Sequence, residues 1–219
     1  MNKILIFGKS DIGEGIKKIF PHTVNIPKEN CDVRDENQIR STLKKYTPEI
    51  IVNCAGISYV QVVKASDVNS WKEEIDVNLV GSYLVAKESI SYGVKTMIFF
   101  ASVAGMYGKP EHSGYSASKS GVISLVQSLG MEGHNAYSIS PGRVDTKMRE
   151  HDYPGEDKRT RLSTLQVAKV VKECIEGKYT AGDNIIIRKR GFTKLKRIDK
   201  GQPWKKYLNV QPLGTPKEI

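Results

Sequence analysis

Short apolar runs that alternate with helix-like segments constrain the fold of this chain more than any other feature. Five runs rich in Ile, Val and Phe are short enough to be strands buried on both faces of a sheet. They lie at Lys3–Phe7, Glu49–Asn53, Thr96–Phe100, Tyr137–Ser140 and Asn184–Ile187. Strands alternating with helices predict βαβ units, and therefore an α/β fold with a doubly wound parallel sheet. Ligands of such sheets bind outside the carboxyl ends of the strands.

Four segments between these runs are predicted to be helices. Apolar residues recur at helical spacing over Asp11–Phe20, Tyr115–Leu129 and Thr164–Ile175. Ser70 and Glu73 have the spacing of a capping box, which predicts a helix from this point to about Ser91.

The composition favours one globular domain, which we expect to span residues 1–190. A chain of 219 residues with 39% hydrophobic and 26% charged residues is ordinary for such a protein. No apolar run reaches the length of a membrane span, and the N-terminal residues lack the features of a signal peptide. Cys31, Cys54 and Cys174 are odd in number and widely spaced, which favours reduced thiols and a cytoplasmic location. No group of Cys and His has metal-ligand spacing, so no metal is expected.

The positive charge is concentrated at the C-terminus. The chain carries +10, and the segment from Arg188 onward holds ten basic and two acidic residues. From Gly191 the apolar period ends and Gly and Pro recur, so residues 191–219 are predicted to be an irregular basic tail. An RNA- or anion-binding tail is one interpretation, but its aromatic residues are few. The nearly neutral body makes a nucleic-acid partner unexpected for the protein as a whole.

A glycine-containing loop follows the first predicted strand and opens the first predicted helix. Glycines allow a sharp turn and a close approach of the backbone to a pyrophosphate, which the amino end of a helix attracts. Taken alone, the segment fits an ordinary tight turn equally well. The candidate phosphate-binding residues are Gly8, Lys9, Ser10, Asp11, Ile12 and Gly13.

Tyr115 and Lys119 are four residues apart and would share one face of a helix. An ammonium near a phenol favours the phenolate, so we expect Lys119 to lower the pKa of Tyr115 from its ordinary value of about 10. Tyr115 would then be a general acid/base for a carbonyl oxygen. Ser102 ends a predicted strand and would hold the substrate oxygen, and the side chain of Asn78 would hold a water that relays protons to Lys119.

With these motifs in order, the sequence resembles the short-chain dehydrogenase/reductase family from Lys3 to about Ile187. The resemblance implies a Rossmann-like fold, an NAD(P) cofactor and hydride transfer between the nicotinamide and a carbonyl/alcohol substrate. It also implies a catalytic tetrad of Asn78, Ser102, Tyr115 and Lys119. The other matching motifs are Asp32-Val33, Asn53-Cys54-Ala55-Gly56, Gly81 after Asn78, Ser102-Val103-Ala104-Gly105 and the segment from Ser140 to Thr146.

The same resemblance assigns roles in cofactor binding. Asp32 would bond the adenine amino group beside the Val33 backbone, and Lys119 would also hold the nicotinamide ribose. The wall near the adenosine ribose would be formed by Asn53, Ala55 and Gly56. The nicotinamide carboxamide would be held by Pro141, Gly142, Val144 and Thr146. In the family, helices like those near 71–91 and 115–129 pair across a two-fold axis, which implies a homodimer or homotetramer.

The sequence departs from the family pattern near the adenosine pocket. Asp11 stands where a glycine is usual, and its carboxylate would cap the first helix. Between His22 and Asp32 there is room for one short strand but none for the helix that normally follows it. No acid clearly ends that strand, whereas Lys9 and Lys28 could face a 2′-phosphate, which favours NADP weakly over NAD. The alternative is that both lysines are solvated surface charges.

A shortened segment follows Thr146, where the family has its substrate lid, so the site is expected to be open. Met148, His151 and Tyr153 are candidate lid residues. His112 is expected at the surface, and Cys54 beneath the cofactor. The substrate stays undetermined, since sugar, keto-acyl, steroid-like and small-alcohol compounds all fit. The alternative function is a regulatory or scaffold protein on the same fold that has lost tight nucleotide binding.

Overall fold

A sheet of six parallel strands and one antiparallel strand forms the centre of the computed structural model, which describes residues 3–189 and 191–194. The strand order is β2-β1-β3-β4-β5-β6-β7. Only the pairing of β6 with β7 is antiparallel. The strands are β1 (Ile4–Phe7), β2 (Val24–Ile26), β3 (Ile50–Asn53), β4 (Thr96–Phe100), β5 (Ala136–Pro141), β6 (Asn184–Arg188) and β7 (Gly191–Lys194).

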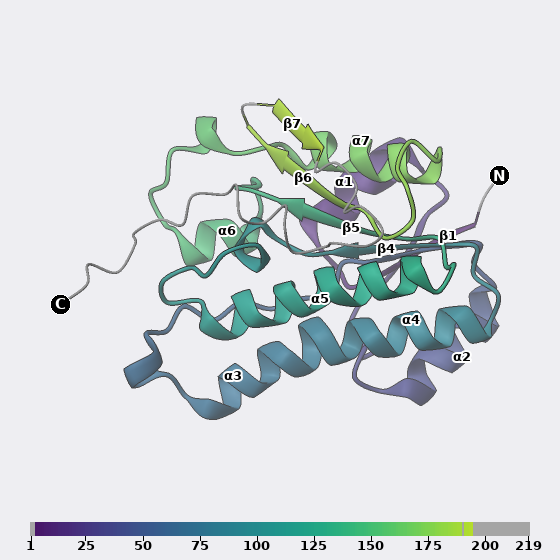
Figure 1. Cartoon of the computed structure of the whole chain (residues 1–219), viewed down its shortest axis with the longest axis horizontal. Helices are drawn as coiled ribbons and strands as arrows, with labels where there is room; N and C mark the ends of the chain where they lie inside the picture. Colours follow the sequence, from purple (N-terminus) through teal and green to yellow (C-terminus); the bar gives the residue numbers. More distant parts are fainter. Residues whose placement is uncertain (1–2, 190, 195–219) are drawn as a thin grey trace.

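Helices cover both faces of this sheet (Figure 1). One face packs against α2 (Glu36–Tyr46), α4 (Gly81–Ser91) and α5 (Ser113–Met131), and the other against α1 (Asp11–Ile19) and α7 (Thr164–Ile175). The remaining helices are α3 (Val68–Ile75), which runs into α4, and the short α6 (Lys147–Asp152). Each face has its own apolar core, because the β1, β3 and β4 side chains are buried on both sides. The predicted Rossmann-like, doubly wound α/β fold is confirmed.

No helix follows β2 before Asp35, as the sequence predicted. A single short strand, β2, lies between His22 and Asp32. The chain then passes through turns to α2 without a helix between Ile26 and Asp35. Within the described residues no further strand pairs outside β2. No helix of this segment therefore covers the adenosine end of a site at the β1 carboxyl end.

Three sequence-based boundaries are corrected. The predicted capping box is wrong: Asp67 caps the helix, which begins at Val68, and its carboxylate accepts from the Ser70 backbone N–H at 2.8 Å. The helix does not run unbroken to Ser91, because a π-helical turn at Asp76–Val80 separates α3 from α4. The predicted irregular tail does not begin at Gly191, since β7 occupies Gly191–Lys194. The rest of that tail lies outside the described residues.

Two kinds of feature are absent from the described part of the chain. Among residues 3–189 and 191–194, no helix is long and apolar enough to cross a membrane. The same residues contain no cluster of His, Cys, Asp and Glu suited to a metal ion. All three cysteines are free thiols.

Candidate active site

A cleft of about 1610 Å³ lies at the carboxyl ends of the parallel strands. Its floor is formed by the segments that leave β1, β3, β4 and β5, which come together because all four strands point the same way. Asn53, Asn78 and Gly13 lie behind the wall and do not line the cleft. The predicted site residues that line it are Gly8, Lys9, Ser10, Asp11, Ile12, Asp32, Val33, Ala55, Gly56, Ser102, Tyr115, Lys119, Pro141, Gly142, Val144 and Thr146.

The loop from Gly8 turns the chain sharply into α1. Gly8 has a φ of +89°, and a Cβ there would meet the Ala55 backbone at 2.7 Å, so only glycine fits. Ser10 caps α1 by accepting from the Gly13 backbone N–H at 3.0 Å. The predicted capping role of Asp11 is therefore wrong. Its carboxylate instead accepts from the Lys147 backbone N–H at 2.7 Å and joins the start of α1 to the start of α6.

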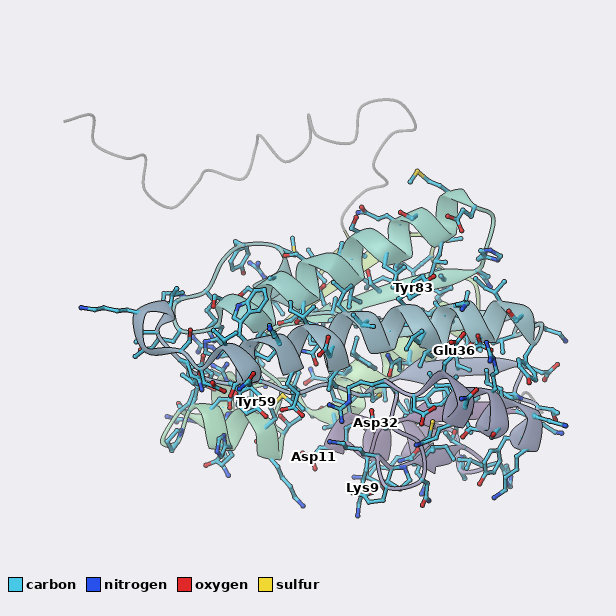
Figure 2. All side chains as sticks on the ribbon, turned by 90° about the horizontal axis from the view of Figure 1, so that it is seen from below. Lys9, Asp11, Asp32, Glu36, Tyr59 and Tyr83 are labelled. Carbon is cyan, nitrogen blue, oxygen red and sulfur yellow. The ribbon has the colours of Figure 1, made fainter. Side chains whose placement is uncertain are left out.

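Charged side chains border the adenosine end of the cleft. Figure 2 shows Lys9, Asp11 and Asp32 on the same side of the molecule, and Lys28 lines the same cleft. The Asp32 carboxylate is held by Arg34, whose Nη2 lies 2.6 Å from Oδ2. This hydrogen bond is the main cause of a lowered pKa for Asp32. Asp32 is therefore an ionised and already paired carboxylate at the edge of the cleft.

The first turn of α5 presents Tyr115 to the cleft. Burial raises the pKa of its phenol to about 12, although a hydrogen bond with Ser102 acts in the opposite direction. The predicted lowering of this pKa by Lys119 is thus wrong for the protein alone, because loss of solvent outweighs the neighbouring charge. The phenol is protonated at neutral pH, which is the form that can donate a proton.

Lys119 lies one turn further along α5 and is almost wholly buried. Its Nζ donates to the carbonyl of Phe100 at 2.8 Å and lies 5.6 Å from the centre of the Tyr115 ring. Burial lowers the pKa of Lys119 to about 8. Among the described residues, only the Phe100 carbonyl accepts from this ammonium. Two of its three donors are thus available to a bound ligand.

Asn78 lies in the π-helical turn, fully buried beside this lysine. Its Nδ2 donates to the carbonyl of Ile57 at 2.9 Å and to Ser118 Oγ at 3.0 Å. Its Oδ1 accepts from the Ile57 backbone N–H at 2.8 Å. The amide therefore braces the segment after β3 against α5. This use of both amide hydrogens does not support the predicted water-holding role of the side chain.

Gly56 leaves a small space open between the cleft, Asn78 and Lys119. A Cβ at position 56 would lie 3.2 Å from Asn78 Oδ1 and 3.4 Å from Lys119 Nζ. Asn53 holds this segment in place, since its Oδ1 accepts from the Ala55 backbone N–H at 3.1 Å. Together with the free donors of Lys119 and the glycine turn before α1, this arrangement fits a dinucleotide along the cleft.

His112 is not the surface residue that the sequence suggested. It is 3% exposed, and its Nδ1 donates to the carbonyl of Pro110 at 2.9 Å. Its Nε2 lies 2.8 Å from Tyr153 Oη and accepts the phenolic proton. The His112 ring stacks on Tyr153 at a centroid distance of 5.7 Å. Of the predicted lid residues, Met148 and Tyr153 line the cleft, whereas the exposed His151 does not.

Sequence reasoning missed Glu74, which holds the amino end of α5. Its buried carboxylate accepts from the Tyr59 backbone N–H at 2.8 Å and from the backbone N–H of Tyr115. Burial raises the pKa of Glu74. A glutamate in the second turn of a predicted helix gives no signal of this contact, because the contact depends on how α3 packs on α5. Lys109 and Arg149, which also line the cleft, were missed for a similar reason.

Comparison with known proteins decides the family. Residues 12–157, well over half of the chain, match the family model described as short chain dehydrogenase. The chain belongs to the short-chain dehydrogenase family. A 3-oxoacyl-(acyl-carrier-protein) reductase of Thermotoga maritima is 29% identical over 168 residues, covering 71% of this chain and 65% of that protein. A human (3R)-3-hydroxyacyl-CoA dehydrogenase is 34% identical over 112 residues, covering 47% and 43% respectively. The chain thus spans less than two thirds of the length of these curated relatives.

Solved dehydrogenase structures share this fold. The ligand-free aldohexose dehydrogenase of Thermoplasma acidophilum superposes with a TM-score of 0.72 at 21% identity, covering 85% of this chain and 92% of that one. A 4-hydroxyisoleucine dehydrogenase in complex with NADH gives a TM-score of 0.72 at 25% identity, covering 87% and 100%. The sheet and its helices are therefore those of the family.

Proposed function

We propose that this protein is an NAD(P)-dependent oxidoreductase that transfers a hydride between the nicotinamide and a carbonyl/alcohol substrate. The observation that carries the proposal is the placement of Tyr115, Ser102 and Lys119 in the cleft that begins at the amino end of α1. Curated relatives named as reductases and dehydrogenases of 3-oxoacyl and 3-hydroxyacyl compounds support carbonyl/alcohol chemistry.

The protonated phenol of Tyr115 suits the reductive direction. A bound nicotinamide would supply or accept the hydride at the substrate carbon. Tyr115 donates its proton to the substrate oxygen as that oxygen gains charge, and Ser102 Oγ orients the same oxygen by a hydrogen bond. The Lys119 ammonium stabilises the phenolate that remains. Asn78 acts as a positioning residue, because its side chain fixes the segment beside Lys119.

The cofactor would extend from Tyr115 to the loop at Gly8. Ser10 and Ile12 would offer the amino end of α1 to its phosphates, and Lys119 would offer two donors to the nicotinamide ribose. At the adenosine end, Lys9 and Lys28 line the cleft and favour a 2′-phosphate. Both lysines are exposed, so solvent weakens such contacts and the expected preference for NADP is modest.

We also propose a homodimer or homotetramer. Val80 in the π-helical turn and Tyr83 on α4 are 40% and 51% exposed, which is unusual for large apolar side chains. Figure 2 shows Tyr83 on α4, and α4 is one of the helices predicted to pair across a two-fold axis. The free cysteines support the expected cytoplasmic location.

Nucleotide titration followed by a turnover assay tests the proposed function. NADPH and NADH are titrated by fluorescence, and each is then combined with a panel of carbonyl compounds. We expect both nucleotides to bind, NADPH more tightly, and at least one carbonyl compound to oxidise them. Failure of both nucleotides to bind would contradict the proposal. Binding without any turnover would favour the regulatory alternative.

Two substitutions test the cofactor preference separately. Lys9→Ala and Lys28→Ala should each lower the ratio of NADPH to NADH affinity, because each removes a cation from the adenosine end of the cleft. Lys44→Ala is the matched control, since Lys44 is an exposed lysine on α2 that does not line the cleft. An unchanged ratio in both cleft variants would show that these lysines are solvated surface charges.

A further inference from the structure

The end of the cleft beyond Tyr115 is strongly cationic. Two acidic residues, Asp152 and Glu156, line this end. The cationic residues that line it are Lys109, Arg143, Arg149, Arg159, Arg188 and Lys189. Arg143 and Arg149 pair with Glu156, and Arg159 pairs with Asp157, so the excess of positive charge comes from the other cations. A concave wall with such an excess concentrates ligands of the opposite charge.

Three of these six cations, Lys109, Arg188 and Lys189, form no ion pair among the described residues, and Lys109 is the one that lies against Tyr153. Among the described residues no carboxylate lies within 4.0 Å of its ammonium, whose polar partner is Tyr153 Oη. Burial lowers the pKa of Lys109 and the neighbouring Arg149 lowers it further, whereas Asp152 and Glu156 act in the opposite direction. A partly buried ammonium without a carboxylate costs free energy, which a bound anion would offset.

Lys109 and Arg149 meet at the ring of Tyr153. Lys109 Nζ lies 4.1 Å and Arg149 Cζ 3.7 Å from the centre of that ring. Arg149 has a carboxylate partner in Glu156, with Nε 2.8 Å from Oε2. Glu156 is itself shared with Arg143 and Arg161, so its charge does not neutralise both Lys109 and Arg149.

Stacked and edge-on rings connect this cation pair to the acid/base residue. His112 stacks on Tyr153, and its ring centre lies 6.3 Å from that of Tyr115 in an edge-on arrangement. The hydrogen bonds of His112 to Pro110 and Tyr153 hold both rings in place. The ring of Tyr153, against which both cations lie, is therefore held in a fixed position relative to Tyr115.

We propose that the substrate carries an oxyanion, a carboxylate or a phosphate, that binds to Lys109 and Arg149 while its carbonyl or alcohol carbon lies at Tyr115. The inference rests on the proposed oxidoreductase function and narrows its substrate class. The anion is separated from the reacting carbon by several bonds, because the ring of His112 lies between the two positions. Charge-assisted hydrogen bonds to both cations give the anionic compound its preference over a neutral analogue.

Matched pairs of ketones test this inference without requiring turnover. One pair is 5-oxohexanoate and its methyl ester, and the other is dihydroxyacetone phosphate and dihydroxyacetone. Ligand-observed NMR measures the affinity of each compound for the full-length protein without nucleotide. We expect the anionic member of at least one pair to bind tenfold or more tightly, which corresponds to about 1.4 kcal/mol. The pair that shows the preference identifies the anion as carboxylate or phosphate.

Variants at one position then locate the anion. Lys109→Gln should remove most of the preference by weakening the anionic compound alone, and Lys109→Arg should retain it. Where a pair is also turned over, Lys109→Gln should raise KM for the anionic member and leave kcat nearly unchanged. Lys169→Gln on α7 is the control, because Lys169 is exposed and does not line the cleft.

The inference and the proposed function fail in different ways. Equal affinity within both pairs, including no detectable binding of any member, would overturn the inference. So would a preference that Lys109→Gln leaves unchanged. An anion preference that depends on Lys109, in a protein that binds no nucleotide, would uphold the anion site and contradict the oxidoreductase.

Discussion

The ammonium of Lys119 lies 5.6 Å from the centre of the Tyr115 ring and donates to the carbonyl of Phe100. The side chain of Lys119 therefore lies in a nearly water-free position beside the phenol of Tyr115. Burial lowers the pKa of Lys119 to about 8 and raises that of Tyr115 to about 12. The protein alone therefore favours the neutral forms of both groups. Burying the charged form of Lys119 costs free energy, which a bound cofactor can offset.

Removing the buried charge should stabilise the protein. Lys119→Met is expected to raise the free energy of unfolding by about 2 kcal/mol at neutral pH, after allowing for the lost bond to Phe100. Chemical denaturation of the variant and the wild type gives this difference. The same substitution should abolish turnover, since the acid/base residue loses its cationic neighbour.

The stability difference should depend on pH in a defined direction. The pKa of Lys119 is about 8 in the folded protein and 10.5 ordinarily, so between these values the unfolded chain binds more protons. The free energy of unfolding of the wild type therefore gains from this group as pH rises through that window, and the advantage of Lys119→Met shrinks. A variant less stable than the wild type at neutral pH, or an advantage that grows with pH, would be inconsistent with a buried charged lysine.

Gly8 allows a comparison that separates backbone strain from steric clash. Gly8 and Gly133 have nearly equal φ values of +89° and +90°, but only at Gly8 would a Cβ meet another backbone, that of Ala55. Gly133→Ala should cost about 1 kcal/mol from the left-handed backbone alone. Gly8→Ala should cost clearly more and should also weaken nucleotide binding. Equal losses of stability in the two variants would show that the approach to Ala55 is unimportant.

Arg161 holds the segment after Thr146 together. Its guanidinium is fully buried and pairs with Asp145, Glu150 and Glu156 at 3.1, 2.6 and 3.2 Å. Arg161→Met should lower the unfolding temperature, because it leaves three carboxylates without their common partner. It should also raise KM for the substrate and speed proteolysis between residues 145 and 161.

Arg159→Met provides the control for this variant. Arg159 is exposed and pairs only with Asp157 among the described residues. Its removal should leave the unfolding temperature nearly unchanged. If both variants lose the same stability, the buried ion pairs of Arg161 do not organise this segment.

The sheet was predictable because its signals are local. Ile4–Phe7 is apolar at every position and Ile50–Asn53 at its first three, a pattern typical of strands buried on both faces. The four-residue spacing of Tyr115 and Lys119 likewise predicts a shared helix face wherever the helix is placed. By contrast, α2 has few apolar residues among many charged ones, and its helical period was not recognised.

Features that depend on packing between distant segments were not predictable. His112 is buried because Tyr153, from the segment around α6, lies over its ring. The pKa of Tyr115 rises because the surrounding elements exclude water, whereas its spacing from Lys119 alone indicates the opposite direction. The π-helical turn at Asn78 depends on contacts with Ile57 and Ser118, which lie 21 and 40 residues away in the sequence.

Turnover by Tyr115→Phe tests the central claim most directly. The substitution removes one hydroxyl group and leaves the ring between His112 and Lys119. With a carbonyl compound reduced by the wild type, kcat/KM should fall about a hundredfold or more, the range expected for loss of a general acid. The unfolding temperature and the affinity for NADPH should stay close to those of the wild type. A folded, nucleotide-binding variant that reduces the same compound within a few-fold of the wild-type rate would contradict the assignment of Tyr115 as the acid/base.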